Sequence, residues 1–235
     1  MTAIISDVHA NYPALKAVMD DIQRRGIKKI FSLGDVCGYY SMINESIDLL
    51  KKMNVVNIRG NHDHYMIENE QCLRSKSVNK SLDFQRQVIT GDNFKWLKES
   101  IPFYRDAEYW MVHGSFSENG MDEYLYTISN NMFATCKEKY FFAGHTHVQT
   151  IVSLDQNRIF CNPGSVGQPR DGDKRAAYAV IDKGDVELIR LEYDIDSIAD
   201  HMKKSGFESY FYENLYTGSN LRGNIMNISF DKDNR

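Results

Sequence analysis

The sequence predicts an α+β fold with an α/β-like first half, and three patterns support this prediction. In the first sixty residues, short apolar runs alternate with apolar residues at helical spacing, which indicates a βαβαβ unit and a largely parallel sheet. Farther along the chain, two apolar runs each lead into histidines. After residue 148, strand-like runs separated by turn residues predict antiparallel hairpins that form a second sheet.

The first strand and the first helix are predicted within residues 2–26. The apolar run Thr2–Ser6 ends at Asp7 and is typical of a buried strand. From Pro13 onward, apolar residues recur three and four positions apart, which indicates an amphipathic helix. Gly26 is a typical stop at the C-terminal end of such a helix.

Two further strands complete the parallel unit. Lys29–Leu33 is followed by Gly34-Asp35, and Val55–Ile58 is followed by Gly60-Asn61-His62-Asp63. Apolar residues at helical spacing in residues 43–50 predict the helix between these strands. In open sheets of this kind, ligands bind beyond the carboxyl ends of the strands. Functional residues are therefore expected at these strand ends.

The middle of the chain is expected to form a lid or cap. Tyr65–Ile101 is polar and predicted to be helical, with Trp96 and Leu97 docking it on the core. The next two apolar runs, Tyr109–Val112 and Tyr140–Ala143, predict strands that lead into His113 and into His145-x-His147 respectively.

The last third of the chain is expected to contain the hairpins and one helix. The helix is predicted near Ile195–Lys204, and an aromatic segment, Phe207–Tyr216, follows it. We expect a single domain over residues 1–217, because no linker or change of composition divides the chain. The polar residues 218–235 are expected to form a loose C-terminal tail. The predicted hairpin strands are Gln149–Leu154, Asn157–Cys161, Ala176–Asp182 and Val186–Tyr193.

Composition excludes several classes of protein. Apolar residues make up 42% of the 235 residues and charged residues 26%, which are ordinary values for a globular protein. The formal charge of −4 offers no basic excess for a phosphate backbone, so nucleic acid is not favoured as a partner. The longest apolar runs are far shorter than the ~20 residues of a membrane helix.

Three features of the sequence bear on cellular location, on the state of the cysteines and on assembly. The N-terminus shows no basic leader or cleavage site, so a cytoplasmic location is expected. The four cysteines are far apart and form no CxxC pair, which argues against a disulfide framework and a cysteine-based zinc site. The aromatic residues Tyr210–Tyr212 either seal the core or form a dimer contact, so a homo-oligomer is compatible with the sequence.

Five of the seven histidines lie in motifs that follow predicted strands. Each motif alone has an ordinary structural explanation: a strand-end aspartate can cap a helix, Gly34-Asp35 can form a turn, and His113 can be a hydrogen-bonded core residue. Together, the motifs predict a metal site, because strand ends bring residues distant in sequence to one place. The motifs are Asp7-x-His9, Gly34-Asp35, Asn61-His62-Asp63, His113 and His145-x-His147.

The residue types favour a site with two divalent cations. Asp35 is the natural bridging carboxylate between cations roughly 3.5 to 4 Å apart. Imidazole, carboxylate and amide ligands without thiolate suit Mn, Fe, Zn, Co or Ni better than Mg. Such a separation between two cations is typical of phosphoryl-transfer sites, and a water shared by two such cations has its pKa lowered toward ~7, which supplies a hydroxide.

These motifs, in this order, resemble those of the calcineurin-like metallophosphoesterase superfamily. The match spans about Ile4–Tyr193, and finer details, such as Asn162–Gln168, are similar to the compact prokaryotic branch of YfcE-like phosphodiesterases and diadenosine tetraphosphatase-related proteins. The resemblance implies a four-layer αββα sandwich. The loops at Tyr40-Ser41 and Phe116-Ser117 depart from the branch pattern, so the substrate of relatives does not transfer directly.

The resemblance also implies roles for the site residues. Asp35 bridges the metals, and Mn or Fe is the first choice of metal. His62 is expected to protonate the leaving oxygen or to stabilise its charge, with Asp63 holding the His62 ring, although Asp63 could instead cap a helix. The first metal is expected to bind Asp7, His9 and His147, and the second to bind Asn61, His113 and His145.

The implied activity is hydrolysis of a phosphodiester or a nucleotide pyrophosphate bond by a metal-bridging hydroxide. Alternatives are a serine/threonine protein phosphatase, or a noncatalytic interaction module on the same scaffold. Candidate substrate-binding residues are Arg170, Arg59 and Tyr39. Arg170 could place a guanidinium beside a phosphate or form part of a solvated loop. Arg59 could contact phosphate or form a structural ion pair, and Tyr39 could stack on a base or pack in the core.

Overall fold

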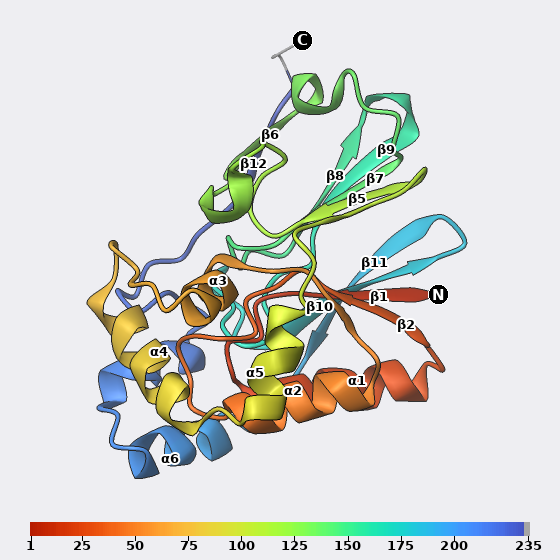
Figure 1. Cartoon of the computed structure of the whole chain (residues 1–235). Helices are drawn as coiled ribbons and strands as arrows, with labels where there is room; N and C mark the ends of the chain where they lie inside the picture. The colour runs from red at the N-terminus through yellow and green to blue at the C-terminus, as the bar shows by residue number, and fades with distance from the viewer. Residues whose placement is uncertain (233–235) are drawn as a thin grey trace.

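The computed structural model describes residues 1–232, which form two five-stranded sheets packed against each other (Figure 1). The first sheet has the strand order β11-β10-β1-β2-β3, with β1, β2 and β3 parallel and β10 antiparallel to β1. Its strands are β1 (Thr2–Ile5), β2 (Lys29–Ser32), β3 (Val56–Asn57), β10 (Ala176–Asp182) and β11 (Asp185–Leu191). The parallel unit expected from the first sixty residues is therefore confirmed.

The second sheet has the order β4-β5-β7-β9-β8, with β5, β7 and β9 parallel to one another. A separate parallel pair joins β6 (Thr127–Ser129) to β12 (Ser229–Asp231). The strands of the second sheet are β4 (Tyr104–Arg105), β5 (Tyr109–Val112), β7 (Tyr140–Ala143), β8 (Thr150–Leu154) and β9 (Arg158–Asn162).

The expectation that both C-terminal hairpins belong to the second sheet is wrong. The β8–β9 hairpin pairs with β7, but the β10–β11 hairpin joins the first sheet, where Thr2 pairs with Ile181. Six successive residues of β10, Ala176–Ile181, are buried. Both faces of β10 are covered there, because Tyr178 and Val180 pack in the cluster that contains α1, and Ala179 and Ile181 pack between the two sheets.

Six α-helices are described, and α1 shows how sequence sets their packing. Asn11 caps α1 by accepting a hydrogen bond from the Ala14 N–H at 3.3 Å, and the apolar stripe that includes Leu15 and Ile22 is fully buried. The expected cap region contains α4 and α5, and Leu97 is fully buried there. The helices are α1 (Tyr12–Arg24), α2 (Ile43–Lys52), α3 (Asn61–Ile67), α4 (Lys76–Val88), α5 (Gly91–Lys98) and α6 (Ile195–Lys204).

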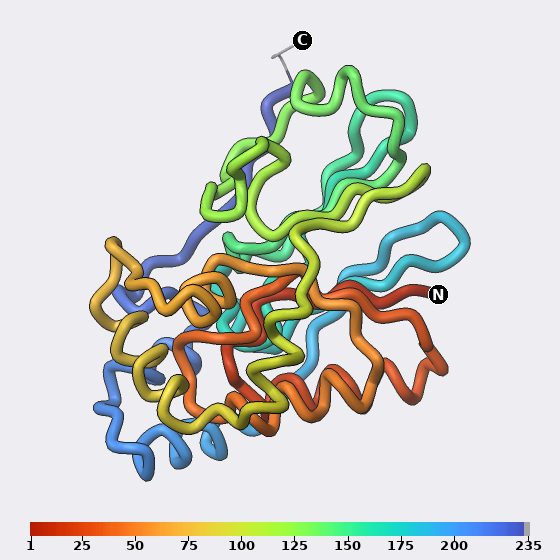
Figure 2. Tube along the Cα trace, viewed as in Figure 1, coloured from red at the N-terminus to blue at the C-terminus, as the bar shows by residue number. Residues whose placement is uncertain are grey.

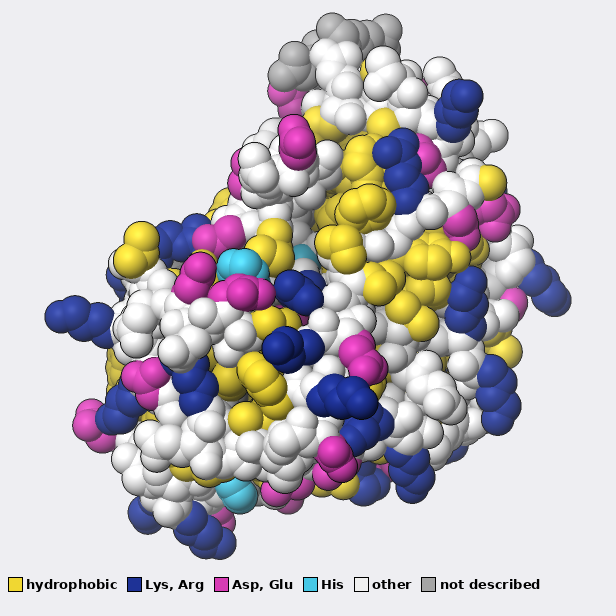
Figure 3. All heavy atoms as spheres, in the orientation of Figure 1, with side chains coloured by type: hydrophobic (Ala, Val, Ile, Leu, Met, Phe, Trp, Pro, Cys, Tyr) yellow, Lys and Arg dark blue, Asp and Glu magenta, His cyan; other side chains and the backbone are white. Residues whose placement is uncertain are grey.

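The core between the sheets follows the two-residue period of the strands. In β7, Tyr140 and Phe142 face the first sheet, whereas Phe141 and Ala143 pack in a separate cluster on the outer face. The α+β sandwich is thus confirmed. The cluster on the outer face of the second sheet includes residues of β6, a short 3-10 helix and Phe230 of β12, and hydrophobic side chains gather over this sheet in Figure 3.

The segment after Gly218 is not a loose tail over its described part. Figure 2 shows it running from the neighbourhood of α6 to the outer face of the second sheet, where β12 forms its separate pair with β6. On the way, the Met226 N–H donates to the Arg170 carbonyl at 2.7 Å. Residues 233–235 of the expected tail lie outside the described residues, and the division at residue 217 stays a prediction.

No helix among residues 1–232 is both long enough and apolar enough to cross a bilayer.

Candidate metal centre and active site

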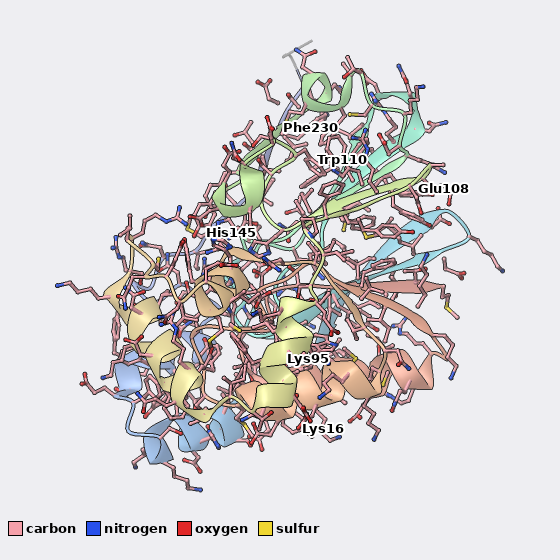
Figure 4. All side chains as sticks on the ribbon, in the orientation of Figure 1. Lys16, Lys95, Glu108, Trp110, His145 and Phe230 are labelled. Carbon is pink, nitrogen blue, oxygen red and sulfur yellow. The ribbon has the colours of Figure 1, made fainter. Side chains whose placement is uncertain are left out.

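The carboxyl ends of strands from both sheets meet at one place. Asp7 follows β1 and Asp35 follows β2 in the first sheet, whereas His113 follows β5 and His145 follows β7 in the second. His145 lies at the junction between α3 and the loops of the second sheet (Figure 4). The seven expected metal ligands are all buried: Asp7, His9, Asp35, Asn61, His113, His145 and His147.

Three of these residues form a first group. The Nε2 atom of His147 lies 3.2 Å from Oδ1 of Asp7 and 3.1 Å from Nε2 of His9. The structure therefore brings together the three side chains that the resemblance assigns to one metal, and their ligand atoms lie within 4.8 Å of one another.

Asn61, His113 and His145 form a second group. The Nε2 atom of His113 lies 3.1 Å from Oδ1 of Asn61 and 3.2 Å from Nδ1 of His145. This group combines one amide oxygen with two imidazole nitrogens, as the resemblance implies for the second metal.

Asp35 lies between the two groups. Its Oδ2 atom is 3.3 Å from Nε2 of His113 in the second group and 3.9 Å from Nε2 of His9 in the first. Its Oδ1 atom accepts a hydrogen bond from the His62 N–H at 2.8 Å, which fixes the carboxylate. A carboxylate in this position can contact cations in both groups.

Backbone carbonyls orient three of the imidazole rings. Nδ1 of His9 lies 2.7 Å from the Cys37 carbonyl oxygen, and Nδ1 of His147 lies 2.6 Å from that of Gln168. Nδ1 of His113 lies 2.9 Å from the carbonyl oxygen of residue 33. Because a carbonyl only accepts, each Nδ1 carries the proton, and a neutral ring then presents the Nε2 lone pair to a metal.

Two buried carboxylate oxygens among the seven expected ligands bear on whether these residues fit cations. Oδ1 of Asp7 and Oδ2 of Asp35 are buried and accept no hydrogen bond from any described residue. A buried carboxylate oxygen without a donor is costly, and two such atoms among imidazole nitrogens fit divalent cations. The residues present therefore fit the two metals expected from the sequence.

Residues 1–185 match the calcineurin-like phosphoesterase superfamily domain. The chain belongs to this superfamily. It is 33% identical to the uncharacterised protein MJ0912 of Methanocaldococcus jannaschii, over 93% of this chain and 98% of that protein. The superfamily expected from the strand-end motifs is confirmed.

Two solved structures of similar length share the metallophosphoesterase fold of this superfamily member. A metallophosphoesterase from Sphaerobacter thermophilus is 29% identical, with a TM-score of 0.78, and the match covers 92% of this chain and 99% of that one. The hypothetical protein PH1004 from Pyrococcus horikoshii is 20% identical, with a TM-score of 0.81, covering 93% and 99% respectively. The second likeness shows the fold alone.

The electrostatics of this phosphoesterase-type centre keep its carboxylates ionised. Burial opposes the charge of Asp7, but the neighbouring imidazoles of His147 and His113 together outweigh burial and lower the pKa of Asp7 well below its usual range. Burial, followed by the neighbouring imidazoles, lowers the pKa of His9 and favours the neutral ring. At His113 burial lowers the pKa, but Asp35 outweighs it and raises the pKa to about 9, so a metal bound at Nε2 would displace a proton from that atom.

The backbone at the centre is strained. Five of the seven expected ligands have left-handed φ angles between 51° and 62°, a region that residues other than glycine rarely adopt. Each such residue costs on the order of 1 kcal/mol, and such strain clusters at functional sites. The five residues are Asp7, His9, Asp35, His145 and His147.

His62 lies beside the cluster, with its Nε2 atom 3.9 Å from Oδ2 of Asp35. Its Nδ1 atom is buried and has no hydrogen-bond partner among residues 1–232, because that edge of the ring packs on Gly38. A Cβ atom at Gly38 would lie 2.0 Å from Nδ1 of His62, so glycine is needed to seat the ring. Burial lowers the pKa of His62 to about 4.

The expectation that Asp63 holds the His62 ring is wrong. Both oxygens of Asp63 accept backbone N–H groups: those of Asp35 and residues 36 and 37 at 2.9 to 3.0 Å, and that of Gly60 at 3.2 Å. No hydrogen bond joins the Asp63 and His62 side chains among the described residues. Asp63 is not the N-cap of α3 either, because Gly60 takes that position and Asp63, three residues later, accepts a hydrogen bond from the Gly60 N–H. Asp63 thus holds the loop that carries Asp35.

Two of the three expected substrate-binding residues lie together. Nη2 of Arg170 donates to the Tyr39 hydroxyl at 2.9 Å, and the Tyr39 ring lies 4.6 Å from that of His9. Arg59 lies elsewhere, in a cavity with His113. It donates to the carbonyl of residue 98 at 3.2 Å and lies 3.9 Å from a carboxylate oxygen of residue 68, which favours the structural alternative for Arg59.

Asp122, which no sequence motif marks, also lies at the centre. Its Oδ1 atom lies 3.8 Å from Nε2 of His145, and Tyr124 stacks on the same ring at 4.0 Å. Asp122 belongs to a short 3-10 helix in a loop between β5 and β6, and nothing in the local sequence marks it.

Proposed function

We propose that the chain is a binuclear metal-dependent phosphoesterase that hydrolyses phosphodiester or nucleotide pyrophosphate bonds. The observation that carries this proposal is the position of Asp35 between two groups of buried ligands, with one carboxylate oxygen directed to both. Two divalent cations held there, with Mn or Fe as the first choice, would activate water and neutralise phosphate oxygens. We further propose that the enzyme is cytoplasmic.

The chain's own residues would position the substrate. The Arg170 guanidinium is buried beside Tyr39 and would bind a non-reacting phosphate oxygen through charge-assisted hydrogen bonds. His62 would lie near the leaving oxygen and either donate a proton to it or stabilise its charge through Nε2. Because Gly38 closes the other edge of the ring, only Nε2 of His62 is available for this role.

The test combines metal content with activity. Purified protein would be loaded with Mn, Fe, Co, Ni or Zn and assayed on bis-p-nitrophenyl phosphate, p-nitrophenyl phosphate, diadenosine tetraphosphate and a phosphopeptide. We expect two metal ions per chain and turnover of a diester or of the tetraphosphate. Preference for the phosphopeptide would favour a protein phosphatase. Two bound metals without turnover on any substrate would favour a noncatalytic module.

A further inference from the structure

A cavity of about 770 Å³ opens beside Tyr39 and Arg170. Two segments distant in sequence form its outer wall: the start of α4, with the residues just before it, and residues 220–222 of the C-terminal segment. The volume is in the range of pockets that bind small molecules. The charged residues that line it are Arg74, Lys76, Lys80, Arg170, Glu208 and Arg222.

The charge of this lining is opposite to that of the chain. The chain carries a formal charge of −4, yet the lining has five basic side chains and one acidic one. Arg74 pairs with Asp122, and Lys80 lies 3.8 Å from Glu208. The other three basic side chains of the lining form no ion pair with any described residue. The cavity is therefore a local positive region that concentrates anions.

Arg170 gives the strongest indication of an anionic ligand. Its side chain is buried, with only 7% of the residue exposed. Nε and Nη2 donate to the amide oxygen of Gln168 at 3.0 and 2.6 Å, and Nη2 also donates to the Tyr39 hydroxyl. These partners are neutral, and Nη1 donates to no described residue. A buried guanidinium without a carboxylate is costly, and an anion in the cavity would offset that cost.

The cavity lies next to the metal centre, because residues that line it contact residues of the centre. The Arg170 N–H donates to the His147 carbonyl at 3.1 Å, and the Tyr39 ring that lines the cavity lies 5.0 Å from the ring of His62. Tyr124 also lines it and stacks on His145. A substrate whose reacting phosphorus lies at the metal centre would extend into this cavity.

We infer that the cavity binds further phosphate groups of the substrate, so that the preferred substrate carries a polyphosphate chain rather than one isolated phosphate. Lys76, at the first turn of α4, and Arg222, in the C-terminal segment, would then be specificity-determining residues. This inference rests on the proposed function in one respect, which is that the reacting phosphorus lies at the metal centre. The basic cavity itself is a binding site whether or not the metal centre turns over.

The test measures binding rather than activity. Inorganic tripolyphosphate would be titrated calorimetrically into the full-length protein as purified, and into the variants Lys76→Gln and Arg222→Gln. We expect each substitution to weaken binding about threefold, the size of one partly exposed charge interaction, and the double variant to weaken it about tenfold. The metal centre is the same in all variants, so a difference between their affinities reports on the cavity.

Two further variants separate the cavity from general effects. Lys183→Gln removes an exposed lysine in the β10–β11 turn, outside the cavity, and should leave the affinity unchanged. Glu208→Gln removes the carboxylate from the lining and should tighten tripolyphosphate binding, a gain that structural damage would not produce. Equal affinity in wild type, Lys76→Gln and Arg222→Gln would overturn the inference. If tripolyphosphate binds with the expected ratios of affinity but no phosphoester is turned over, the cavity is still an anion-binding site. That result would refute only the proposed function.

Discussion

The Nε2 atoms of His9 and His147 face each other at 3.1 Å, although 138 residues separate them in sequence. The other nitrogen of each ring lies against a backbone carbonyl, so neutral rings direct two lone pairs at the same point. Two acceptors at this distance repel unless a cation or a proton lies between them. Together with Asp7, they form one half of the proposed metal centre.

Asp35→Asn is expected to weaken both halves at once. Its carboxylate is the group that faces His9 and His113 together, and an amide is a poorer ligand than a carboxylate. We expect fewer than two metal ions per chain by elemental analysis, and a loss of phosphoesterase activity of at least ~100-fold, above the range for residues that only support a ligand. Asp20→Asn, at an exposed carboxylate on α1, is the matched control. Full metal content in Asp35→Asn would contradict a bridging role.

His62→Ala should separate chemistry from metal binding. Because His62 lies beside the cluster and is not an expected ligand, the variant should retain both metal ions and lose turnover by ~10² or more. His64→Ala is the control, since His64 is on the same helix but lies near Glu70, 3.6 Å away. Loss of metal from the His62 variant would place His62 among the ligands instead.

Much of the centre's composition is visible in the sequence because parallel strands end at a shared edge. Asp7, Asp35 and Asn61 follow successive strands of one parallel unit, and this local pattern is sufficient to expect their proximity. His113 and His145 also follow strands, yet those strands belong to the second sheet. Their motifs mark them as candidates, but only the packing of the two sheets brings them to the first group.

Other features depend on partners that the sequence does not specify. The role of Asp63 is set by the backbone N–H groups of residues 35–37. Almost every residue type has such a group, so the sequence does not reveal this role. The position of the β10–β11 hairpin depends on long-range pairing with β1. Residues 220–222 line a cavity because β12 anchors the chain beyond them, and a three-residue strand has too short a pattern to detect.

Asp63→Asn tests the corrected role of Asp63. The side-chain NH2 of asparagine would replace an oxygen that now accepts two backbone N–H hydrogen bonds, and an NH2 group cannot accept them. Each buried donor left without an acceptor costs about 1–3 kcal/mol. We expect the free energy of unfolding by urea to fall by at least about 2 kcal/mol. Asp83→Asn, an exposed carboxylate on α4 that pairs with Arg86, should change it little. Unchanged stability, with a shift only in the pH profile of turnover, would restore the ring-orienting role.

Gly38→Ala should displace His62 without removing any ligand. The added Cβ would lie 2.0 Å from Nδ1 of His62, and φ at Gly38 is +87°. Gly206→Ala is a close control, because φ there is +82° but nothing lies within 4 Å of the added carbon. In both variants, backbone strain should reduce the free energy of unfolding by about 1 kcal/mol. Only Gly38→Ala should also lose turnover, and equal turnover in the two would show that the position of the ring is unimportant.

Asp21 provides a pH test remote from the metal centre. It joins α1 to β10 by accepting a hydrogen bond from the Tyr178 hydroxyl, and it pairs with Arg25 at 2.9 Å. Burial opposes its charge, but Tyr178 and Arg25 outweigh burial and lower the pKa of Asp21. A lowered pKa in the folded state adds stability above the unfolded pKa of about 4, and this stability is lost as pH falls through the folded value.

Asp21→Asn should therefore reduce the free energy of unfolding by about 1–2 kcal/mol at pH 7. The difference from wild type should stay constant down to about pH 4 and then shrink, because wild-type Asp21 becomes protonated in both states. Urea unfolding at pH 7, 5, 4 and 3 measures this difference. Asp20→Asn, in the exposed pair with Lys16, should show almost no difference at any of these values. A gap that persists undiminished at pH 3 would mean that packing, not charge, stabilises the contact between α1 and β10.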